Sequence, residues 1–266
     1  MTANSMLRAQ GVRMQFGGIV ALDDAGVEVT PGRIVGLIGR NGSGKSTLFN
    51  CITGFLEPNT GRITLDGRDI GGLAPHLIVK AGVARTFQTP RVDLRATVRD
   101  AVLCGLFPTV TRSFAAATLG LPAARAQERA LQNRADDVLR QLDMQQWRDV
   151  EIGKLSMGRV RMVEVARAMA ANARYLLLDE PAAGLSRAEH EVLAREIRKL
   201  AAQGIGVLLV EHNFGLIRML CDSVTVLDAG RVLLSATPQE VERDEQVRRL
   251  YLGAATEAVS VAGEPA

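Results

Sequence analysis

Short hydrophobic runs alternate with segments of helical spacing along most of this chain. The runs 34–38, 175–178 and 207–210 are almost wholly apolar, which is typical of strands buried on both faces of a parallel sheet. The segment 187–202 instead places apolar residues three and four apart, as on one face of a helix. This alternation predicts an α/β fold with a mostly parallel sheet that is covered by helices on both faces.

Two regions depart from this alternation. Near the N-terminus, residues 7–15 and 19–29 predict two strands that are joined at a pair of glycines. Between 91 and 154 the strand signals disappear, while 98–106 and 125–142 keep helical spacing. We therefore expect a helical subdomain that is inserted into the α/β core.

We expect one domain that spans residues 1–253. Its α/β core would comprise about 7–90 and 162–253, and its helical subdomain about 91–161. The tail 254–266 has a small, polar composition and is expected to be disordered.

The stretch Gly39 to Ser46 matches the phosphate-binding loop pattern G-x-x-x-x-G-K-[ST]. It lies between an apolar run of strand length and a segment in which Leu48 and Ile52 are four residues apart. Glycines let the backbone bend around phosphates with its N–H groups pointing inward, and the following helix N-terminus adds partial positive charge. Lys45 can reach the β- and γ-phosphates and Ser46 can hold Mg²⁺. The loop predicts a nucleoside triphosphate as ligand.

Polar residues follow three other predicted strands. Gln88 follows 83–87, Asp179 and Glu180 end the run that begins at Tyr175, and His212 follows 207–210. Ligands of such sheets bind at the carboxyl ends of the strands, where these residues and Lys45 should meet. Carboxylates there suggest Mg²⁺ and an attacking water. The histidine could touch a γ-phosphate, although a lone histidine or glutamine often has only a structural role.

Two further residues are candidates for nucleotide contacts. Ser156 is a good N-cap for a helix over 160–171, and Ser-x-Gly at a helix start can also form a second anion site because its N–H groups are free. Phe16, at the turn between the first two strands, could stack on a base or be a core aromatic. Position alone does not decide between the two for Phe16.

Composition narrows the class of protein. There are 32 basic and 29 acidic residues, a balance that argues against a nucleic-acid binder. The three cysteines, Cys51, Cys104 and Cys221, are far apart, and we expect them to be reduced, buried thiols of a cytosolic protein. No run approaches the ~18 apolar residues of a membrane span, so we expect a chain that is soluble alone and whose membrane role needs partner chains.

The order of these motifs resembles that of the ATP-binding cassette (ABC) ATPases, over residues 7 to about 253. The shared order is phosphate loop, glutamine loop, helical insert, LSxG-type signature, strand with Asp-Glu, and histidine. The stretches 84–88, 180–186, 210–213 and 251–253 look like those of the ATP-binding subunits of branched-chain amino acid importers. The resemblance implies a P-loop NTPase (RecA-like) core, with an ABC-type antiparallel β region and the inserted helical subdomain.

The resemblance also implies a role for each matching position. Glu180 would be the general base, His212 would contact the γ-phosphate, and Gln88 would sense Mg²⁺ and water and couple to the membrane subunit. Asp179 would bind Mg²⁺ through water, together with Ser46. ATP would be bound by Phe16, Gly39, Asn41, Gly42, Ser43, Gly44, Lys45, Ser46 and Thr47, and by Ser156 and Gly158 of the opposing subunit.

A head-to-tail dimer would join the two anion sites of each chain into two complete ATP sites, with 184–186 in the loop that crosses between subunits. Three residues depart from the common pattern. Met157 replaces a glycine of the usual LSGGQ, Arg159 replaces a Gln or an acid, and Ser186 stands where Asn or Asp is common. Arg159 could aid phosphate binding or alter partner choice.

The expected partners are a second cassette, identical or different, and integral membrane permeases. A periplasmic or extracellular binding protein would act indirectly, and the cassette would lie peripherally at the cytoplasmic face of the inner membrane. The main alternative is the ATPase of a lipid or lipopolysaccharide exporter. A soluble ABC ATPase of repair or translation would usually carry long coiled coils or two cassettes, and a P-loop kinase would leave the signature and the histidine unexplained.

Overall fold

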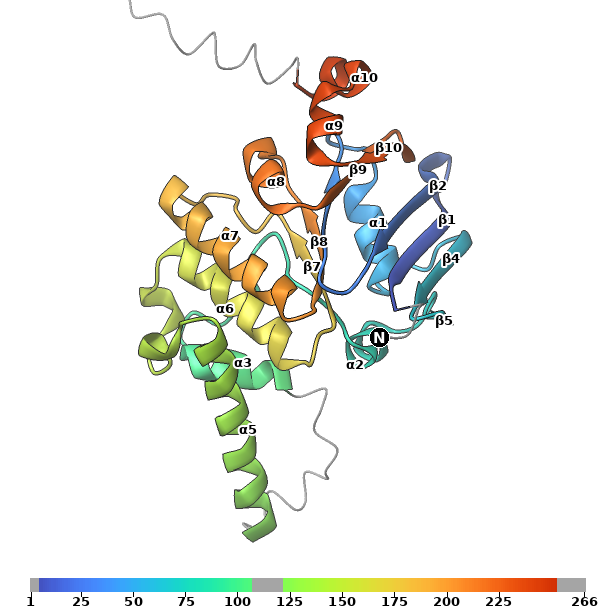
Figure 1. Cartoon of the computed structure of the whole chain (residues 1–266). Coiled ribbons are helices and arrows are strands. Elements are labelled where there is room, and N and C mark those ends of the chain that lie inside the picture. The colour runs from blue at the N-terminus through green and yellow to red at the C-terminus, as the bar shows by residue number, and fades with distance from the viewer. Residues whose placement is uncertain (1–4, 107–121, 253–266) are drawn as a thin grey trace, which may run out of the picture.

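Two β-sheets and a group of helices make up this computed structural model, which describes residues 5–106 and 122–252 (Figure 1). The larger sheet has six strands in the order β10-β9-β3-β8-β7-β6. Its strands are β3 (Ile34–Ile38), β6 (Val83–Arg85), β7 (Tyr175–Asp179), β8 (Gly206–Val210), β9 (Ser223–Asp228) and β10 (Arg231–Ala236). All neighbours pair in parallel except β10 with β9, which confirms the mostly parallel sheet.

The smaller sheet is antiparallel and has the order β2-β1-β4-β5. It consists of β1 (Leu7–Phe16), β2 (Ile19–Val29), β4 (Thr60–Leu65) and β5 (Arg68–Asp69). It is the predicted antiparallel region, and the turn after Phe16 leads directly into β2.

Helices lie on both faces of the larger sheet. The α-helices are α1 (Lys45–Ile52), α2 (Pro75–Ala81), α3 (Val98–Leu106), α5 (Pro122–Gln141), α6 (Met157–Ala170), α7 (Arg187–Ala202), α8 (Phe214–Leu220), α9 (Pro238–Arg243) and α10 (Glu245–Val247). Short 3-10 turns η2 (Gln145–Trp147) and η3 (Ile152–Lys154) precede α6, and a π turn η4 (Arg248–Leu252) follows α10. In Figure 1, α3, α5 and α6 lie together below and beside α7, away from the antiparallel sheet.

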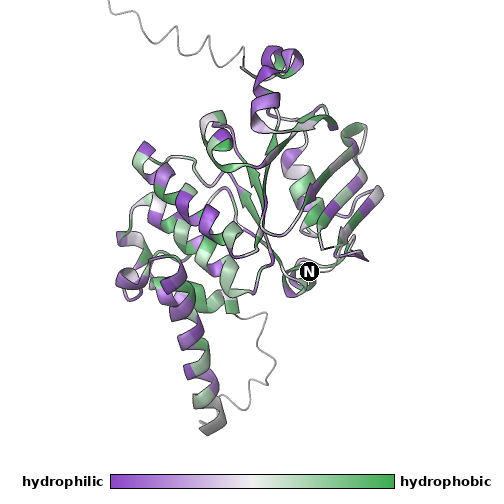
Figure 2. Ribbon diagram, viewed as in Figure 1, coloured by the Kyte–Doolittle hydropathy of each residue, from purple (hydrophilic) through white to green (hydrophobic). Residues whose placement is uncertain are grey.

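The larger sheet divides the hydrophobic core into two parts. Side chains of a strand alternate between its faces, so Leu176 and Leu178 pack with the helices α3, α5, α6 and α7. Tyr175 and Leu177 face the other way, toward α1 and the antiparallel sheet. Figure 2 shows the central strands as almost continuously hydrophobic, as expected for a sheet covered on both faces.

Three details differ from the sequence-based expectations. Strand β6 ends at Arg85, so Thr86 and Phe87 lie beyond it. Glu180 lies outside β7, with a φ of 47° that L-residues seldom adopt. Cys104 is exposed, so the expectation of three buried thiols is wrong for this residue: it lies on a solvent-facing side of α3, whereas Cys51 and Cys221 are buried.

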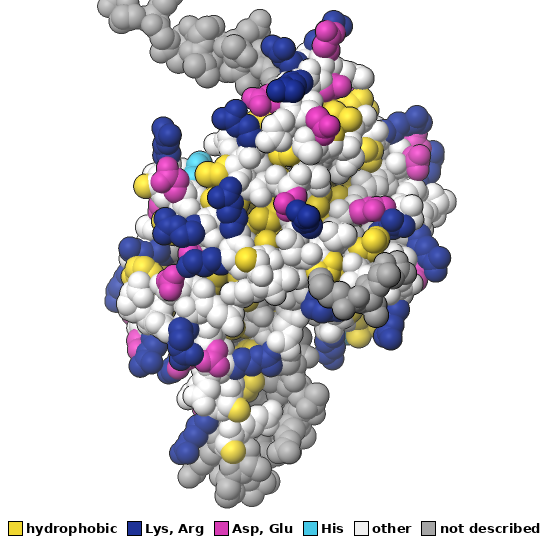
Figure 3. Space-filling model, in the orientation of Figure 1, with side chains coloured by type: hydrophobic (Ala, Val, Ile, Leu, Met, Phe, Trp, Pro, Cys, Tyr) yellow, Lys and Arg dark blue, Asp and Glu magenta, His cyan; other side chains and the backbone are white. Residues whose placement is uncertain are grey.

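Charges of both signs are interspersed on the face that Figure 3 shows, with hydrophobic side chains scattered among them. Within 5–106 and 122–252, none of the helices combines the length and the apolar character needed to cross a membrane. The stretch 108–124, between the two helical segments that the sequence predicts, falls largely outside the described residues, and so does the tail 254–266.

Candidate functional site

Four neighbouring strands end at one edge of the larger sheet, and each is followed by a predicted site residue. The strands lie in the order β3, β8, β7, β6. The phosphate loop follows β3, His212 follows β8, Glu180 follows β7 and Gln88 follows β6. The parallel arrangement therefore gathers residues that are far apart in the sequence, as expected from the carboxyl-end rule.

The phosphate loop is shaped by its glycines. Gly44 caps α1 with a φ of 104°, and a Cβ there would lie 2.6 Å from a methyl carbon of Leu22. A Cβ on Gly39 would lie 2.4 Å from the carbonyl oxygen of Leu227. Neither position can take a larger residue without moving the backbone of a neighbouring element. The loop is thus held between β2 and β9.

The loop contains two polar side chains that suit a phosphate ligand. The ammonium of Lys45 is largely buried and donates to the carbonyl oxygens of Gly39 and Arg40. Burial lowers the pKa of Lys45, while the nearby carboxylates of Glu180 and Asp179 raise it. The hydroxyl of Ser43 is buried and, within the described part of the chain, has no hydrogen-bond partner. Unpaired buried polar groups are costly, so an anionic ligand would satisfy this site.

The carboxylate of Glu180 is held from two sides. The amide nitrogen of Gln88 donates to Oε2 at 2.8 Å, and Nε2 of His212 lies 2.7 Å from Oε1. A carboxylate only accepts hydrogen bonds, so Nε2 of His212 carries the proton in this contact. The structure thus brings Gln88, Glu180 and His212 into direct contact, beside Lys45.

Arg85 is a site residue for which the sequence suggested no role. Its guanidinium lies 2.7 Å from Oδ2 of Asp179, and it donates to Oδ1 of Asn50 on α1 at 2.6 Å. Both partners of the ion pair are about nine-tenths buried, and the guanidinium also lies 5.3 Å from the ring centres of Phe49 and Phe87. A charged residue in an otherwise apolar strand was the signal that could have identified it.

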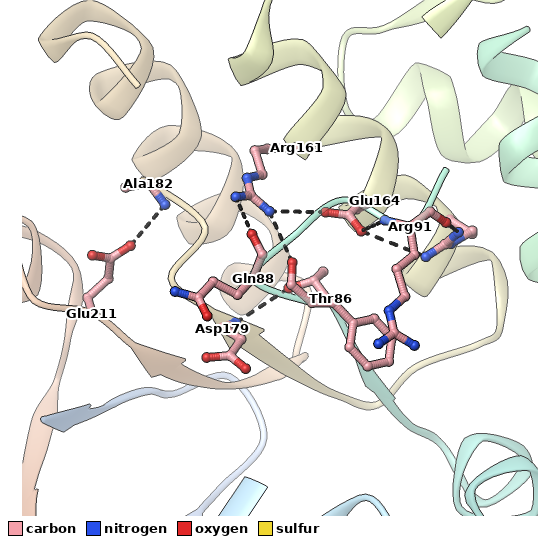
Figure 4. A network of polar contacts seen from close by, with 10 residues as sticks. Thr86, Gln88, Arg91, Arg161, Glu164, Asp179, Ala182 and Glu211 are labelled. Atoms are coloured by element: carbon pink, nitrogen blue, oxygen red, sulfur yellow. Dashed lines mark hydrogen bonds and ion pairs between the residues drawn. The ribbon is translucent and has the colours of Figure 1, made fainter. Parts of the chain in front are cut away.

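A second unforeseen group holds the glutamine loop. Arg161 of α6 donates to the carbonyl oxygens of Phe87 and Gln88, and lies 3.4 Å from Glu164 (Figure 4). Glu164 also accepts from the backbone N–H of Arg91 at 3.1 Å. Arg161 and Glu164 are both buried. Two opposite charges three residues apart on an apolar helix face indicated a buried pair, but not its target.

Glu211 supports the segment after Glu180. It is buried, and its Oε1 accepts from the N–H of Ala182 at 2.9 Å (Figure 4). Its Oε2 accepts from the N–H of His212 at 3.2 Å. Burial raises the pKa of Glu211, the backbone N–H groups lower it, and the nearby charge of Glu180 raises it further. Glu211 therefore links the loops that carry Glu180 and His212.

The signature residues lie elsewhere in the chain's own structure. Ser156 caps α6, and Gly158 is buried in its first turn. Among the described residues, no hydrogen bond or ion pair joins Ser156 or Gly158 to Lys45, Gln88, Glu180 or His212. Arg159, the departure from the common signature, lies with its guanidinium 4.2 Å from the ring centre of Trp147, so cation–π contact occupies it.

The structure also shows where Phe16 and Ser186 lie. Phe16 is 46% exposed at the start of the turn into β2, and Ala21 and Leu22 of β2 press against Gly44 of the phosphate loop. An exposed ring at this turn is available for stacking. Ser186, which stands in place of the common Asn or Asp, caps α7 and forms a capping box with Glu189.

The oxygen atoms of Ser46 and Asp179 at this site are suited to binding Mg²⁺ together with a nucleotide. Ser46 is exposed at the start of α1, and Arg85 binds only Oδ2 of Asp179, so Oδ1 remains for a water ligand of a metal. Hydroxyl, carboxylate and amide oxygens are the ligands that Mg²⁺ prefers, and it usually keeps several waters. Within the described ranges no group of three His, Cys, Asp or Glu side chains could hold a metal by itself.

Known proteins share this arrangement. A model of the ABC transporter family matches residues 22–183. The chain belongs to the ABC transporter family. It is 36% identical over 251 residues to the high-affinity branched-chain amino acid transport ATP-binding protein BraF of Pseudomonas aeruginosa, with 94% of this chain and 98% of BraF covered.

The lipopolysaccharide export system ATP-binding protein LptB of Acidithiobacillus ferridurans is also 36% identical, over 250 residues, and 98% of it is covered. The crystal structure of the ADP conformation of an ATP-binding cassette of an ABC transporter matches with a TM-score of 0.82 and 30% identity, covering 93% of this chain and 98% of that chain. The protein is therefore an ABC ATPase that binds adenine nucleotide, and subunits of this family work with membrane permeases. The predicted family and fold are confirmed.

Proposed function

We propose that this cassette is the ATP-hydrolysing motor of an importer for branched-chain amino acids or related amino acids and amides. The observation that carries this proposal is the contact of Glu180 with both Gln88 and His212, next to Lys45. It supports the proposal because Glu180 as base, His212 as γ-phosphate contact and Gln88 as loop residue would then all lie beside the phosphate-binding cation. The likeness to BraF over nearly the whole chain supports the substrate class.

In the proposed reaction, backbone N–H groups of 39–47 and the ammonium of Lys45 bind the triphosphate. Glu180 accepts the proton of an attacking water, because an ionised carboxylate is an acceptor within reach of the γ-phosphate. Its two oxygens each accept one hydrogen bond, from Gln88 and from His212. Each oxygen has a second acceptor site, which can receive the proton of the attacking water.

Mg²⁺ would be held by Ser46 and Gln88 and, through water, by Asp179, and when bound it would neutralise charge on the phosphates. His212 donates from Nε2 in the present contact, so the same proton is suited to a γ-phosphate oxygen. Asn41 and Gly42 lie exposed at the phosphate loop, and Phe16 offers its ring to adenine.

Two copies of the cassette, or this one and a different one, would close head to tail. Ser156 and Gly158 of each would then contact the γ-phosphate on the other, and 184–186 would cross between them. The separation of the signature from the Lys45 cluster within one chain supports this arrangement. The proposed domain is 1–253, with the α/β core at about 7–90 and 162–253 and the helical subdomain at about 91–161.

The motor would sit at the cytoplasmic face of the inner membrane against two permeases, which would receive substrate from an external binding protein. Export of lipopolysaccharide is the second candidate, because LptB matches with the same identity as BraF.

The test is uptake of radiolabelled leucine by cells of the source organism that lack this gene. The intact gene should restore uptake and the Lys45→Ala gene should not, and restoration by both would reject the proposal. A strain with normal uptake and a defective outer membrane would favour the exporter.

A further inference from the structure

The carboxylate of Glu189 contacts the signature residues of its own chain. The side-chain hydroxyl of Ser156 and the backbone N–H of Gly158 lie close enough to this carboxylate to lower the pKa of Glu189. A Cβ on Gly158 would lie 2.7 Å from Oε1 of Glu189, so only a glycine lets the carboxylate come this close. The carboxylate thus takes the two donors that the proposed function reserves for a γ-phosphate.

The second carboxylate oxygen of Glu189, Oε2, is held by Ser186. The backbone N–H and the hydroxyl of Ser186 donate to Oε2 at 3.0 and 2.9 Å, which completes the capping box of α7. Hydrogen bonds from the Ser186 backbone and hydroxyl, then from Ser156 and Gly158, lower the pKa of Glu189 to about 2. Glu189 is therefore an anion at neutral pH.

Capping α7 does not require the contact with the signature. Glu240 forms the same capping box at α9, where Oε2 accepts from the N–H and the hydroxyl of Thr237 at 2.8 and 2.7 Å. That box works without a second helix. Glu189 differs in that its other oxygen bridges to the start of α6, on a different element.

A hydroxyl and an N–H each have one hydrogen to donate. Ser156 and Gly158 cannot give these hydrogens to a phosphate oxygen while the carboxylate of Glu189 holds them. Two anions at one donor pair would also repel each other. A cavity of about 460 Å³ adjoins the pair, so the displaced carboxylate has room; its lining includes the cationic side chains of Arg159 and Arg195 and the acidic side chains of Asp143 and Glu196.

We infer that Glu189 is an intramolecular occupant of the signature anion site, which a γ-phosphate must displace before the dimer closes. This inference rests on the proposed head-to-tail function. Glu189 then sets how much ATP the closed dimer requires, and it links closure to the segment 184–186 through the capping box with Ser186. It touches no reacting atom.

The first test uses the full-length monomer and inorganic phosphate as the probe. Backbone amide resonances of residues 156–159 would be followed by NMR during a phosphate titration. Glu189→Ala should shift them at a phosphate concentration at least about tenfold lower than the unchanged protein, since a charged hydrogen bond is worth more than that ratio. Glu240→Ala, which removes a like capping box, should leave the titration unchanged.

Glu189→Gln serves as a second variant, because it keeps the shape and one acceptor for the helix cap; it should bind phosphate with intermediate strength. Equal titration curves for the unchanged protein and both Glu189 variants would overturn the inference. So would tighter phosphate binding by the unchanged protein, because Glu189 would then be positioning the donors for the anion instead of competing with it.

The second test asks for the functional consequence. In proteins that also carry Glu180→Gln, the ATP concentration for half-maximal dimerisation would be measured by sedimentation. Glu189→Ala should lower it about fivefold or more, and Glu240→Ala should not. If Glu189→Ala frees the amides for phosphate but no protein dimerises with ATP, the occupancy stands and the head-to-tail function fails. If dimers form at the same ATP concentration with and without Glu189, the function stands and the inference fails.

Discussion

The guanidinium of Arg85 lies 2.7 Å from the carboxylate of Asp179, and both side chains are about nine-tenths buried. Removing one partner of such a pair leaves a buried charge without compensation. We expect Arg85→Met to lower the free energy of unfolding by about 3–5 kcal/mol. It should also change the Mg²⁺ concentration at half-maximal ATPase activity, because Asp179 loses the cation that fixes its orientation. Denaturant unfolding and Mg²⁺ titrations would measure the two effects.

Arg62→Met is a matched control for this prediction. Arg62 and Asp69 are also paired, but their side chains are 67% and 51% exposed. Surface pairs contribute only about 0–1 kcal/mol, so this variant should resemble the unchanged protein in both measurements. Equal effects of the two substitutions would mean that burial of the Arg85 pair does not matter.

Lys45→Ala should abolish ATPase activity and weaken ATP binding, because the phosphates lose a largely buried cation. Phosphate release and nucleotide binding by calorimetry would measure these effects. Lys80→Ala, at the exposed end of α2, should leave both unchanged. Undiminished turnover of the Lys45 variant would contradict the assignment of this loop as the ATP site.

Glu180→Gln should slow hydrolysis by about 10²–10⁴-fold, since an amide cannot accept the proton of water. Its ATP binding should persist, because Lys45, Ser46 and Asp179 remain. We therefore expect a dimer on gel filtration with ATP, formed with the partner cassette if the natural dimer is heterologous. Glu245→Gln, in an exposed ion pair, should hydrolyse normally and show no such trapping.

Adding Ser156→Arg to Glu180→Gln should restore the monomer. The new side chain would block the signature donors that close on the opposing nucleotide. A double variant that dimerises as well as the single one would show that the signature does not close the site, and the head-to-tail arrangement would then be wrong.

Glu211 should make stability fall as pH rises. Burial raises its pKa above the usual value of 4.5, so the folded state holds its proton more tightly than the unfolded state does. The stabilisation that comes from the proton on Glu211 is complete below about the pKa that this group has in the unfolded state. It is lost as pH rises through the pKa that Glu211 has in the folded state. Glu211→Gln, which keeps an acceptor for the N–H of Ala182, should melt with less pH dependence above the usual glutamate pKa of 4.5. Glu191→Gln, on the exposed face of α7, should match the unchanged protein, and parallel curves for all three would refute the prediction.

Local sequence patterns were enough to predict the helices and strands, and also the site residues that follow the strands. The phosphate loop, the strand before Glu180 and the helix 187–202 each depend on neighbours in sequence, and the carboxyl-end rule then predicts where they meet. The partner of Asp179 could not be predicted in this way, because Arg85 is 94 residues away in sequence. The burial of Arg161 and the contact of Glu189 with Ser156 likewise depend on how helices pack. The exposure of Cys104 depends on which side of α3 packs against α5 and α6.

Helix α6 carries the signature turn at its N-terminus. One turn later it carries the buried Arg161, which donates hydrogen bonds to the carbonyl oxygens of Phe87 and Gln88. Over this distance a helix behaves as a stiff rod with a rise of about 1.5 Å per residue. A displacement of the glutamine loop would therefore move Ser156 by a similar amount, because both are attached to the same rigid helix and the Arg161–Glu164 pair holds the loop to it. In the proposed head-to-tail arrangement, α6 would thereby connect the glutamine loop of one cassette to the nucleotide bound by the opposite cassette.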